Sequence, residues 1–284
     1  MEEERRTVIR PGATLAVYSY GPAPAPGIPT ILFVHGYPDD HTLFEYAVPA
    51  LSTDCRVITY DTRNAGASRT TSKKLDYYRL PALVDDLFAV INAAGAGPVH
   101  LVGHDWGSIQ GWAAIQDPRA KERILSFTSI SGPDLGHLRR WFKQRLRRPL
   151  LWPQALGQML RSSYVAFFQL PVLPELLWRK FLTARFEKFA GRGIGDNGVR
   201  GLALYRANSF RRQQLSGRCS VRVQVVVPRR DPFLSPRLVD GVQEWVPQLE
   251  VVEVDAGHWW PPEHIRSFVQ HLRNWIAATG TSPQ

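Results

Sequence analysis

The sequence predicts an α/β fold in which a mostly parallel sheet is flanked by helices and carries a helical insertion. The composition of the 284 residues, 44% hydrophobic and 21% charged, is that of a globular protein with a large core, and it excludes disordered and fibrous classes. Short β-branched runs alternate with helix-like segments, as in sheets whose crossovers are helices. The strand pattern stops after residue 130 and resumes at residue 221, which predicts the insertion.

Five short runs in the first half of the chain are predicted strands, because each is rich in β-branched residues and is bounded by turn residues. Residues 80–94 are predicted to form a helix between the third and fourth runs. Leu83 and Leu87 belong to a one-sided apolar stripe there, and Pro81 suits the first helical turn. The predicted strands are residues 15–20, 31–35, 57–60, 99–103 and 126–130.

Residues 133–217 have a different character, with prolines, arginines and aromatic residues but no strand alternation. This pattern predicts a helical insertion, and we refer to it as the lid. It divides a sheet domain made of residues 1–132 and 218–284. An insertion at this point lies over the carboxyl ends of the strands, where such folds bind ligands, although each single aromatic residue is more often a core side chain. The elements predicted after the lid are strands at 221–227 and 249–254 and a helix at 262–277.

The formal net charge is +10, and six of the ten residues from 139 to 148 are basic. A solvated helix face is the ordinary explanation of such a run. Anionic membrane lipids and acidic proteins are the alternative partners, while nucleic acid is not expected because no recognition motif accompanies the run. A homodimer is left open.

Two cysteines, Cys55 and Cys219, are too few for a disulfide framework. The first residues lack the basic and apolar regions of a signal peptide, and no run approaches the ~20 apolar residues of a membrane span. We therefore expect a soluble protein of the cytoplasm.

The predicted strand at 99–103 runs into the motif G-H-D-W-G, residues 103–107, and then into helix-like sequence. Glycines two positions before and after the central residue permit a sharp, strained turn that exposes the central side chain. That side chain is the carboxylate of Asp105, which we predict to be a nucleophile. The alternative is that Asp105 only caps the following helix.

An aspartate at this position restricts the reaction. A serine that attacked a saturated carbon would form a stable ether, whereas a carboxylate forms an ester that water can later cleave. The substrate should therefore carry its leaving group on an sp³ carbon, as an epoxide or an alkyl halide does. Hydrolysis of esters or peptides is not expected.

Cleavage of the ester needs a base that activates water, and His258 is the candidate. It lies in the loop after the predicted strand at 249–254, where it can reach the strand ends. Asp231, in the loop after the strand at 221–227, is the candidate partner of this histidine. Asp134 is the alternative acid.

A second motif, made of His35, Gly36, Tyr37 and Pro38, directly follows a predicted strand. It is placed to contribute the backbone N–H of Tyr37 to an oxyanion hole, with the N–H of Trp106 as the second donor. On its own the motif would be an ordinary turn.

Together, G-H-D-W-G, H-G-Y-P, the late Asp231 and G-H-W at 257–259 resemble the motifs of epoxide hydrolases with the α/β-hydrolase fold. The resemblance covers essentially the whole chain, and the order of nucleophile, acid and histidine is the order of that fold. The chain also resembles the hydrolase part of bacterial proteins in which a short-chain dehydrogenase domain follows.

The resemblance further implies two lid tyrosines that act on the epoxide oxygen, and Tyr164 and Tyr205 fall at those positions. Haloalkane dehalogenases are the near alternative, since they share the Asp-Trp elbow but commonly carry Asn or another halide donor where this chain has Tyr37. A non-catalytic binding protein of the same fold is the second alternative, and the complete set of nucleophile, acid and histidine argues against it.

The implied reaction has two steps. Asp105 opens a small apolar epoxide while Tyr164 and Tyr205 protonate its oxygen. His258, assisted by Asp231, then directs water onto the ester and releases a vicinal diol. The resemblance implies neither a metal nor an organic cofactor, and it implies an epoxide and water as the partners.

Overall fold

The computed structural model describes residues 3–72, 74–211 and 217–280 of the chain. The predicted strands are all present, with ends that shift by at most about two residues, and the described residues add two further strands. The strands are β1 (Glu4–Arg10), β2 (Ala13–Tyr20), β3 (Thr30–Val34), β4 (Arg56–Tyr60), β5 (Arg69–Thr70), β6 (Val99–His104), β7 (Ile124–Ile130), β8 (Arg222–Pro228) and β9 (Leu249–Val254).

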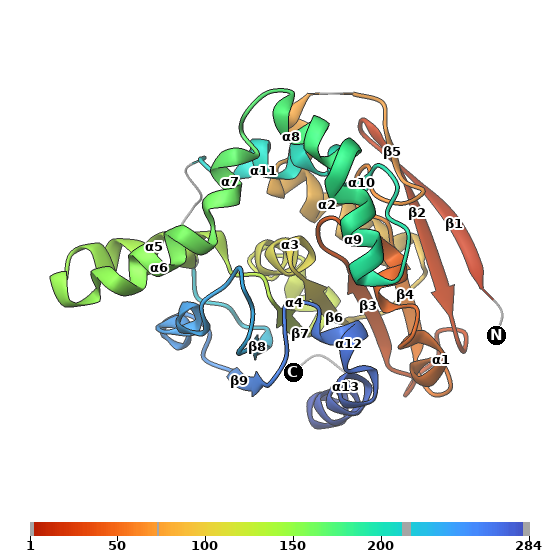
Figure 1. Cartoon of the computed structure of the whole chain (residues 1–284). Helices are drawn as coiled ribbons and strands as arrows, with labels where there is room; N and C mark the ends of the chain where they lie inside the picture. Colours follow the sequence, from red (N-terminus) through yellow and green to blue (C-terminus); the bar gives the residue numbers. More distant parts are fainter. Residues whose placement is uncertain (1–2, 73, 212–216, 281–284) are drawn as a thin grey trace.

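These strands form one sheet in the order β1-β2-β4-β3-β6-β7-β8-β9, with β5 paired to β2 (Figure 1). The pairs that involve β2 are antiparallel, and every pair from β4 to β9 is parallel. The mostly parallel sheet predicted from the sequence is therefore confirmed.

β1 is absent from the sequence prediction because its residues do not form an apolar run. Only Val8 of its seven residues is buried, and the strand pairs with β2 alone at the edge of the sheet. An edge strand of this kind needs few buried side chains, so its sequence carries little strand signal.

Helices cover both faces of the sheet (Figure 1). Leu32 of β3 belongs to an apolar cluster with α2 and α3, whereas the next residue, Phe33, belongs to a cluster with α1, α12 and α13. This alternation is what a strand buried on both faces requires. The helices of the sheet domain are α1 (Val48–Leu51), α2 (Leu80–Ala93), α3 (Trp106–Ala114), α4 (Ala120–Arg123), α12 (Trp260–Glu263) and α13 (Ile265–Thr279), with short 3-10 turns η1 (His41–Phe44), η2 (Leu75–Tyr78), η5 (Pro236–Val239) and η6 (Val242–Glu244).

The helix predicted at 262–277 is interrupted in the structure. His264, with φ −132° and ψ 50°, separates α12 from α13. The apolar residues of α13 still face the sheet as the predicted helix required, since Phe268 and Leu272 are fully buried.

Between β7 and β8 the described residues form helices and no strand, and these helices lie over one end of the sheet (Figure 1). Their aromatic side chains, Phe168, Trp178 and Tyr205, pack in one cluster with Tyr37 and Trp106 of the sheet domain. The helices of the lid are α5 (Leu135–Leu146), η3 (Pro149–Leu151), α6 (Trp152–Arg161), α7 (Ser163–Phe167), α8 (Leu173–Leu177), the π-helical turn η4 (Trp178–Leu182), α9 (Thr183–Ala190), α10 (Asn197–Arg200) and α11 (Leu202–Asn208).

Within the described ranges, no helix has both the length and the apolar character needed to cross a bilayer.

Candidate active site

Asp105 stands at a strained turn between β6 and α3. Its φ of 51° and ψ of −118° lie outside the regions that side-chain-bearing residues ordinarily adopt. A Cβ at Gly103 would collide with the backbone of Gly107, and a Cβ at Gly107 would collide with the carbonyl of Val34. The turn therefore requires both glycines. The Asp105 side chain makes no capping hydrogen bond to α3, so the geometry does not support a role as a helix cap.

The carboxylate of Asp105 lies beside the two backbone N–H groups named from the sequence. The N–H of Tyr37 donates to Asp105 Oδ1 at 2.7 Å, and the N–H of Trp106 is close enough to lower the pKa of the carboxyl group. The same two donors can hold an oxyanion that forms on this carboxyl carbon.

The rest of the H-G-Y-P motif is anchored behind these donors. His35 donates from Nδ1 to the carbonyl of Gly36 at 2.8 Å and accepts at Nε2 from the N–H of Thr62 at 3.0 Å. The peptide bond between Tyr37 and Pro38 is cis. The bonds of His35 thus tie the loop that carries the Tyr37 N–H to Thr62, and Gly36 and Pro38 flank Tyr37 in this loop.

Burial raises the pKa of Asp105 to about 6. The neighbouring His258 and the N–H groups of Tyr37 and Trp106 lower this pKa, but they offset only part of the cost of burying the charge. The carboxylate is therefore less well stabilised than in water, which favours its reaction as a nucleophile.

His258 lies between two carboxylates. Its Nδ1 is 2.8 Å from Oδ2 of Asp231, and its Nε2 faces Asp105 Oδ2 at 3.8 Å. Burial alone would lower the pKa of His258, but the hydrogen bond to Asp231 and the charges of both carboxylates raise it. Burial would raise the pKa of Asp231, and the bond to His258 lowers it instead. The imidazole is thus oriented with Nε2 toward the predicted nucleophile.

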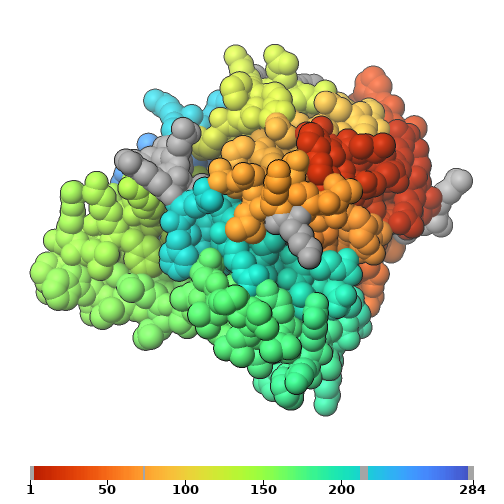
Figure 2. Space-filling view, turned by 90° about the horizontal axis from the view of Figure 1, so that it is seen from above, coloured from red at the N-terminus to blue at the C-terminus, as the bar shows by residue number. Residues whose placement is uncertain are grey.

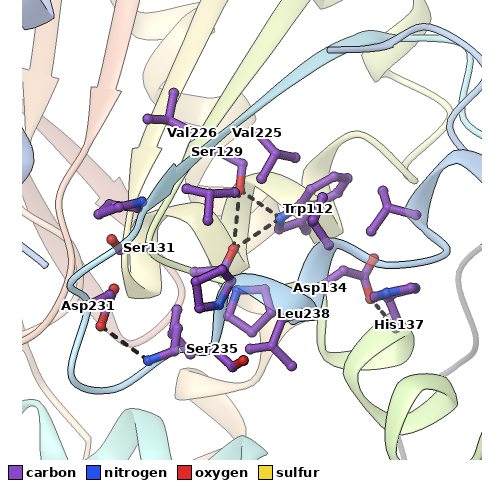
Figure 3. Close-up of a pocket in the computed structure, with 18 residues that line it drawn as sticks. Trp112, Ser129, Ser131, Asp134, His137, Val225, Val226, Asp231, Ser235 and Leu238 are labelled. Atoms are coloured by element: carbon purple, nitrogen blue, oxygen red, sulfur yellow. Dashed lines mark hydrogen bonds between the residues drawn. The ribbon is translucent and has the colours of Figure 1, made fainter. Parts of the chain in front are cut away.

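Asp134, the alternative acid, has a different role in the structure. Its side chain accepts from the N–H of His137 at 2.9 Å and caps α5. Figure 3 shows Asp134 and Asp231 on different sides of a small cavity beside β7 and β8. The geometry therefore supports Asp231 as the partner of His258.

Two polar residues that the sequence analysis did not single out hold the His258 loop. Ser131 has a φ of 50°; its hydroxyl donates to the carbonyl of His258 at 3.2 Å and helps to lower the pKa of Asp231. His104 also bonds this carbonyl, from Nε2 at 2.9 Å, and burial lowers its pKa to about 4, so it stays neutral. His104 lies within the elbow motif, whereas nothing in the sequence around Ser131 marks it.

Tyr164 of α7 and Tyr205 of α11 pack against each other in the lid. Their ring centroids are 5.9 Å apart and the rings make an edge-to-face contact. Burial and the charge of Asp105 raise the pKa of both phenols, so both remain protonated at neutral pH. The lid thus supplies two phenols that are close enough to Asp105 for its charge to act on both.

One group of side chains in the described part of the chain has the spacing of metal ligands: Asp40, His41 and Asp61. Their atoms are already engaged, since Asp61 accepts from His41 and from the N–H of Ala67, and Asp40 accepts from Thr42. We therefore assign the group a structural role, in which it joins the turn after β4 to the loop after β3.

Residues 29–264 match the family of proteins with the alpha/beta hydrolase fold. The chain belongs to this family. In this α/β hydrolase the elbow, the candidate acid and the candidate histidine follow one another along the chain in the order that is typical of the fold.

The chain is also similar to individual proteins of known sequence or structure. This hydrolase is 35% identical over 277 residues to the "Probable oxidoreductase EphD" of Mycobacterium tuberculosis, an alignment that covers 89% of the chain and 46% of that protein. It is 26% identical to mouse "Epoxide hydrolase 3", over 86% of the chain and 69% of that protein. Among solved structures, an epoxide hydrolase of Bacillus megaterium in complex with an inhibitor has a TM-score of 0.80 at 23% identity, with 96% and 100% of the two chains covered. The chain thus spans about half the length of its mycobacterial relative.

Proposed function

We propose that this α/β hydrolase is an epoxide hydrolase, which converts an apolar epoxide into a vicinal diol through an aspartyl-ester intermediate. One observation carries the proposal: a buried carboxylate at the elbow lies close to two protonated tyrosines from the lid and faces a histidine–aspartate pair from the sheet domain. The names of the mouse and Bacillus relatives support it. The oxidoreductase name belongs to a protein about twice as long as this chain.

In the first step, an Asp105 oxygen attacks an epoxide carbon and the C–O bond of the ring breaks. The oxygen that leaves becomes an alkoxide unless it receives a proton, and a phenol is acidic enough to provide one. Tyr164 and Tyr205 hydrogen-bond this oxygen together, and one of them transfers its proton. The products of this step are the ester on Asp105 and a neutral hydroxyl group.

In the second step, water attacks the ester carbonyl carbon of Asp105. His258 takes the proton of this water at Nε2, and Asp231 stabilises the imidazolium that forms. The N–H groups of Tyr37 and Trp106 bind the oxyanion of the tetrahedral intermediate. Its collapse releases the diol and restores the carboxylate, and the proton held by His258 returns to the tyrosinate left by the first step, so that both residues regain their starting states.

A haloalkane dehalogenase is the second candidate, because the same carboxylate attacks an alkyl halide equally well. Halide departs without a proton but needs N–H or O–H donors. One obvious donor near Asp105 is already used, because the Tyr37 hydroxyl donates to the carbonyl of Gly198 at 2.6 Å. This arrangement favours an epoxide as the substrate.

The deciding experiment offers the protein a panel of apolar epoxides and 1-haloalkanes and measures diol and free halide. Diol from epoxides without halide release supports the proposal. Halide release with no diol would establish the dehalogenase, and no turnover of either class would favour a binding protein of this fold. Location in the cytoplasm, homodimer formation and peripheral contact with anionic membranes remain predictions beside this proposal.

A further inference from the structure

The net positive charge of the protein comes entirely from the lid. Residues 133–217 contain 16 Lys or Arg and only four Asp or Glu, whereas the rest of the chain contains 19 and 21. The lid therefore carries a formal charge of +12 and the sheet domain −2. A segregation of this size creates a field that attracts an anionic surface to the lid side of the molecule.

The lid also holds most of the exposed large apolar side chains. Thirteen of the seventeen such residues found in the described chain lie between residues 146 and 210. Leu150 is 94% exposed and Leu160 is 75% exposed. Figure 2 shows that the lid, in light green through green to blue-green, extends across one face of the molecule. Apolar patches on proteins usually mark a surface that contacts a partner or a membrane.

The two kinds of side chain are combined most clearly in α5 and α6, which project from the body of the molecule (Figure 1). On α6, Trp152, Leu156 and Leu160 follow one another at i, i+4 and i+8 and form an exposed apolar stripe. Lys143 of α5 and Arg147, the residue that caps its C-terminus, are exposed, whereas Trp141 and Arg145 of α5 are buried. Arg145 has a structural role, because it pairs with Asp240 at 2.6 Å and stacks on Trp141.

We propose that the lid is a docking surface for a bilayer of anionic phospholipids. Its apolar side chains enter the boundary between headgroups and acyl chains, and its lysines and arginines bind the headgroup phosphates. A second copy of this chain is a poorer occupant, because two lids that face each other bring like charges together. An acidic protein would meet the charge but would leave the exposed leucines without an apolar partner.

This surface includes residues directly before and after α7, which carries Tyr164, and residues directly after α11, which carries Tyr205. Docking therefore positions the lid side of the active site at the phase into which an apolar epoxide partitions. This delivery role rests on the proposed function, whereas the binding itself does not. Vesicle binding is measured without any substrate, so its result and the outcome of the epoxide assay are independent.

The test is flotation of the intact protein with vesicles of phosphatidylcholine alone and of phosphatidylcholine mixed equally with phosphatidylglycerol. We expect binding to the anionic vesicles only, with a loss as salt is raised because the Debye length shrinks from about 10 Å at 0.1 M to about 3 Å at 1 M. Each cation near an anionic surface strengthens binding about fivefold, so loss of three should weaken it roughly a hundredfold.

Three triple variants separate charge from apolar contact. The lid charge variant should bind anionic vesicles roughly a hundredfold more weakly than the parent does. The lid apolar variant should lose the vesicle binding that persists at high salt. A matched variant that removes three exposed cations from the sheet domain should bind as the parent does. The variants are Lys143→Gln/Arg147→Gln/Arg148→Gln, Leu150→Ser/Leu156→Ser/Leu160→Ser, and the control Lys121→Gln/Arg218→Gln/Arg266→Gln.

Equal binding of the parent to both vesicle types, or none to either, overturns the proposal. So does a lid charge variant that binds as tightly as the control variant. A parent that binds soluble polyglutamate as tightly as vesicles identifies an acidic protein partner instead, and a dimer that only the lid apolar variant abolishes identifies a second copy. If a lid variant fails to fold by circular dichroism, the lipid and salt dependence of the parent still decides the question.

Discussion

Replacement of Asp105 by asparagine should stabilise the folded protein at neutral pH, although it removes the proposed nucleophile. Burial raises the pKa of this carboxyl from 3.8 to about 6. At a pH between 3.8 and about 6, the carboxyl group of Asp105 is protonated in the folded protein but ionised in the unfolded chain. The free energy of unfolding therefore falls as the pH rises through this window, and the penalty is complete above about pH 7.

The size of the effect follows from the two pKa values. One pKa unit corresponds to about 1.4 kcal/mol, so the penalty amounts to about 3 kcal/mol. Asparagine is never ionised, and its side-chain oxygen can still accept from the N–H of Tyr37, so the variant avoids this penalty. The attraction of His258 is already contained in the pKa of about 6, so about 3 kcal/mol is the full gain expected at neutral pH.

Urea unfolding of the parent and Asp105→Asn at about pH 7 and about pH 4 measures the difference. The variant should be more stable at neutral pH, and the difference should nearly vanish at the acidic pH, where the folded parent is protonated. Asp231→Asn is the matched control with the opposite sign: the bond to His258 outweighs burial and lowers the pKa of Asp231, so this variant should be destabilised at neutral pH. A variant at position 105 that is no more stable than the parent at about pH 7 would refute the reasoning.

Three further predictions concern catalysis. In a single turnover in ¹⁸O-labelled water the label should enter Asp105, which mass spectrometry of the peptide that contains Asp105 can detect. The His258→Gln variant should accumulate the ester. Label that is found only in the diol would contradict a covalent intermediate. Tyr164→Phe and Tyr205→Phe should each slow ester formation by about 10²-fold or more. The double variant should nearly abolish ester formation, and the effects of the two substitutions should not be additive because both phenols act on one oxygen. Ester formation at the parental rate in these variants would remove both phenols from the mechanism. Ester formation should fall about tenfold for each pH unit below about 6, because Asp105 attacks only when ionised, and a flat profile down to about pH 4 would contradict the raised pKa.

Local sequence was sufficient for most of the sheet and for the elbow. A strand buried on both faces, such as β3, must be apolar throughout, and its sequence therefore marks it. The elbow needs glycine at 103 and 107 because any Cβ there would collide with backbone, so that spacing predicts the turn. The edge strand β1 and the break at His264 escaped prediction because neither depends on an apolar pattern.

The sequence by itself thus determined the fold class, the nucleophile candidate and the histidine, since each follows from residues that are neighbours in the chain. Only the tertiary structure decided between Asp231 and Asp134: both follow strands that are adjacent in the sheet, and the path of each loop determines which carboxylate reaches the imidazole. It also brought Tyr164 against Tyr205 and set the raised pKa of Asp105. Proximity between distant segments and the removal of water from a charge are properties of the packed molecule, and no local pattern encodes them.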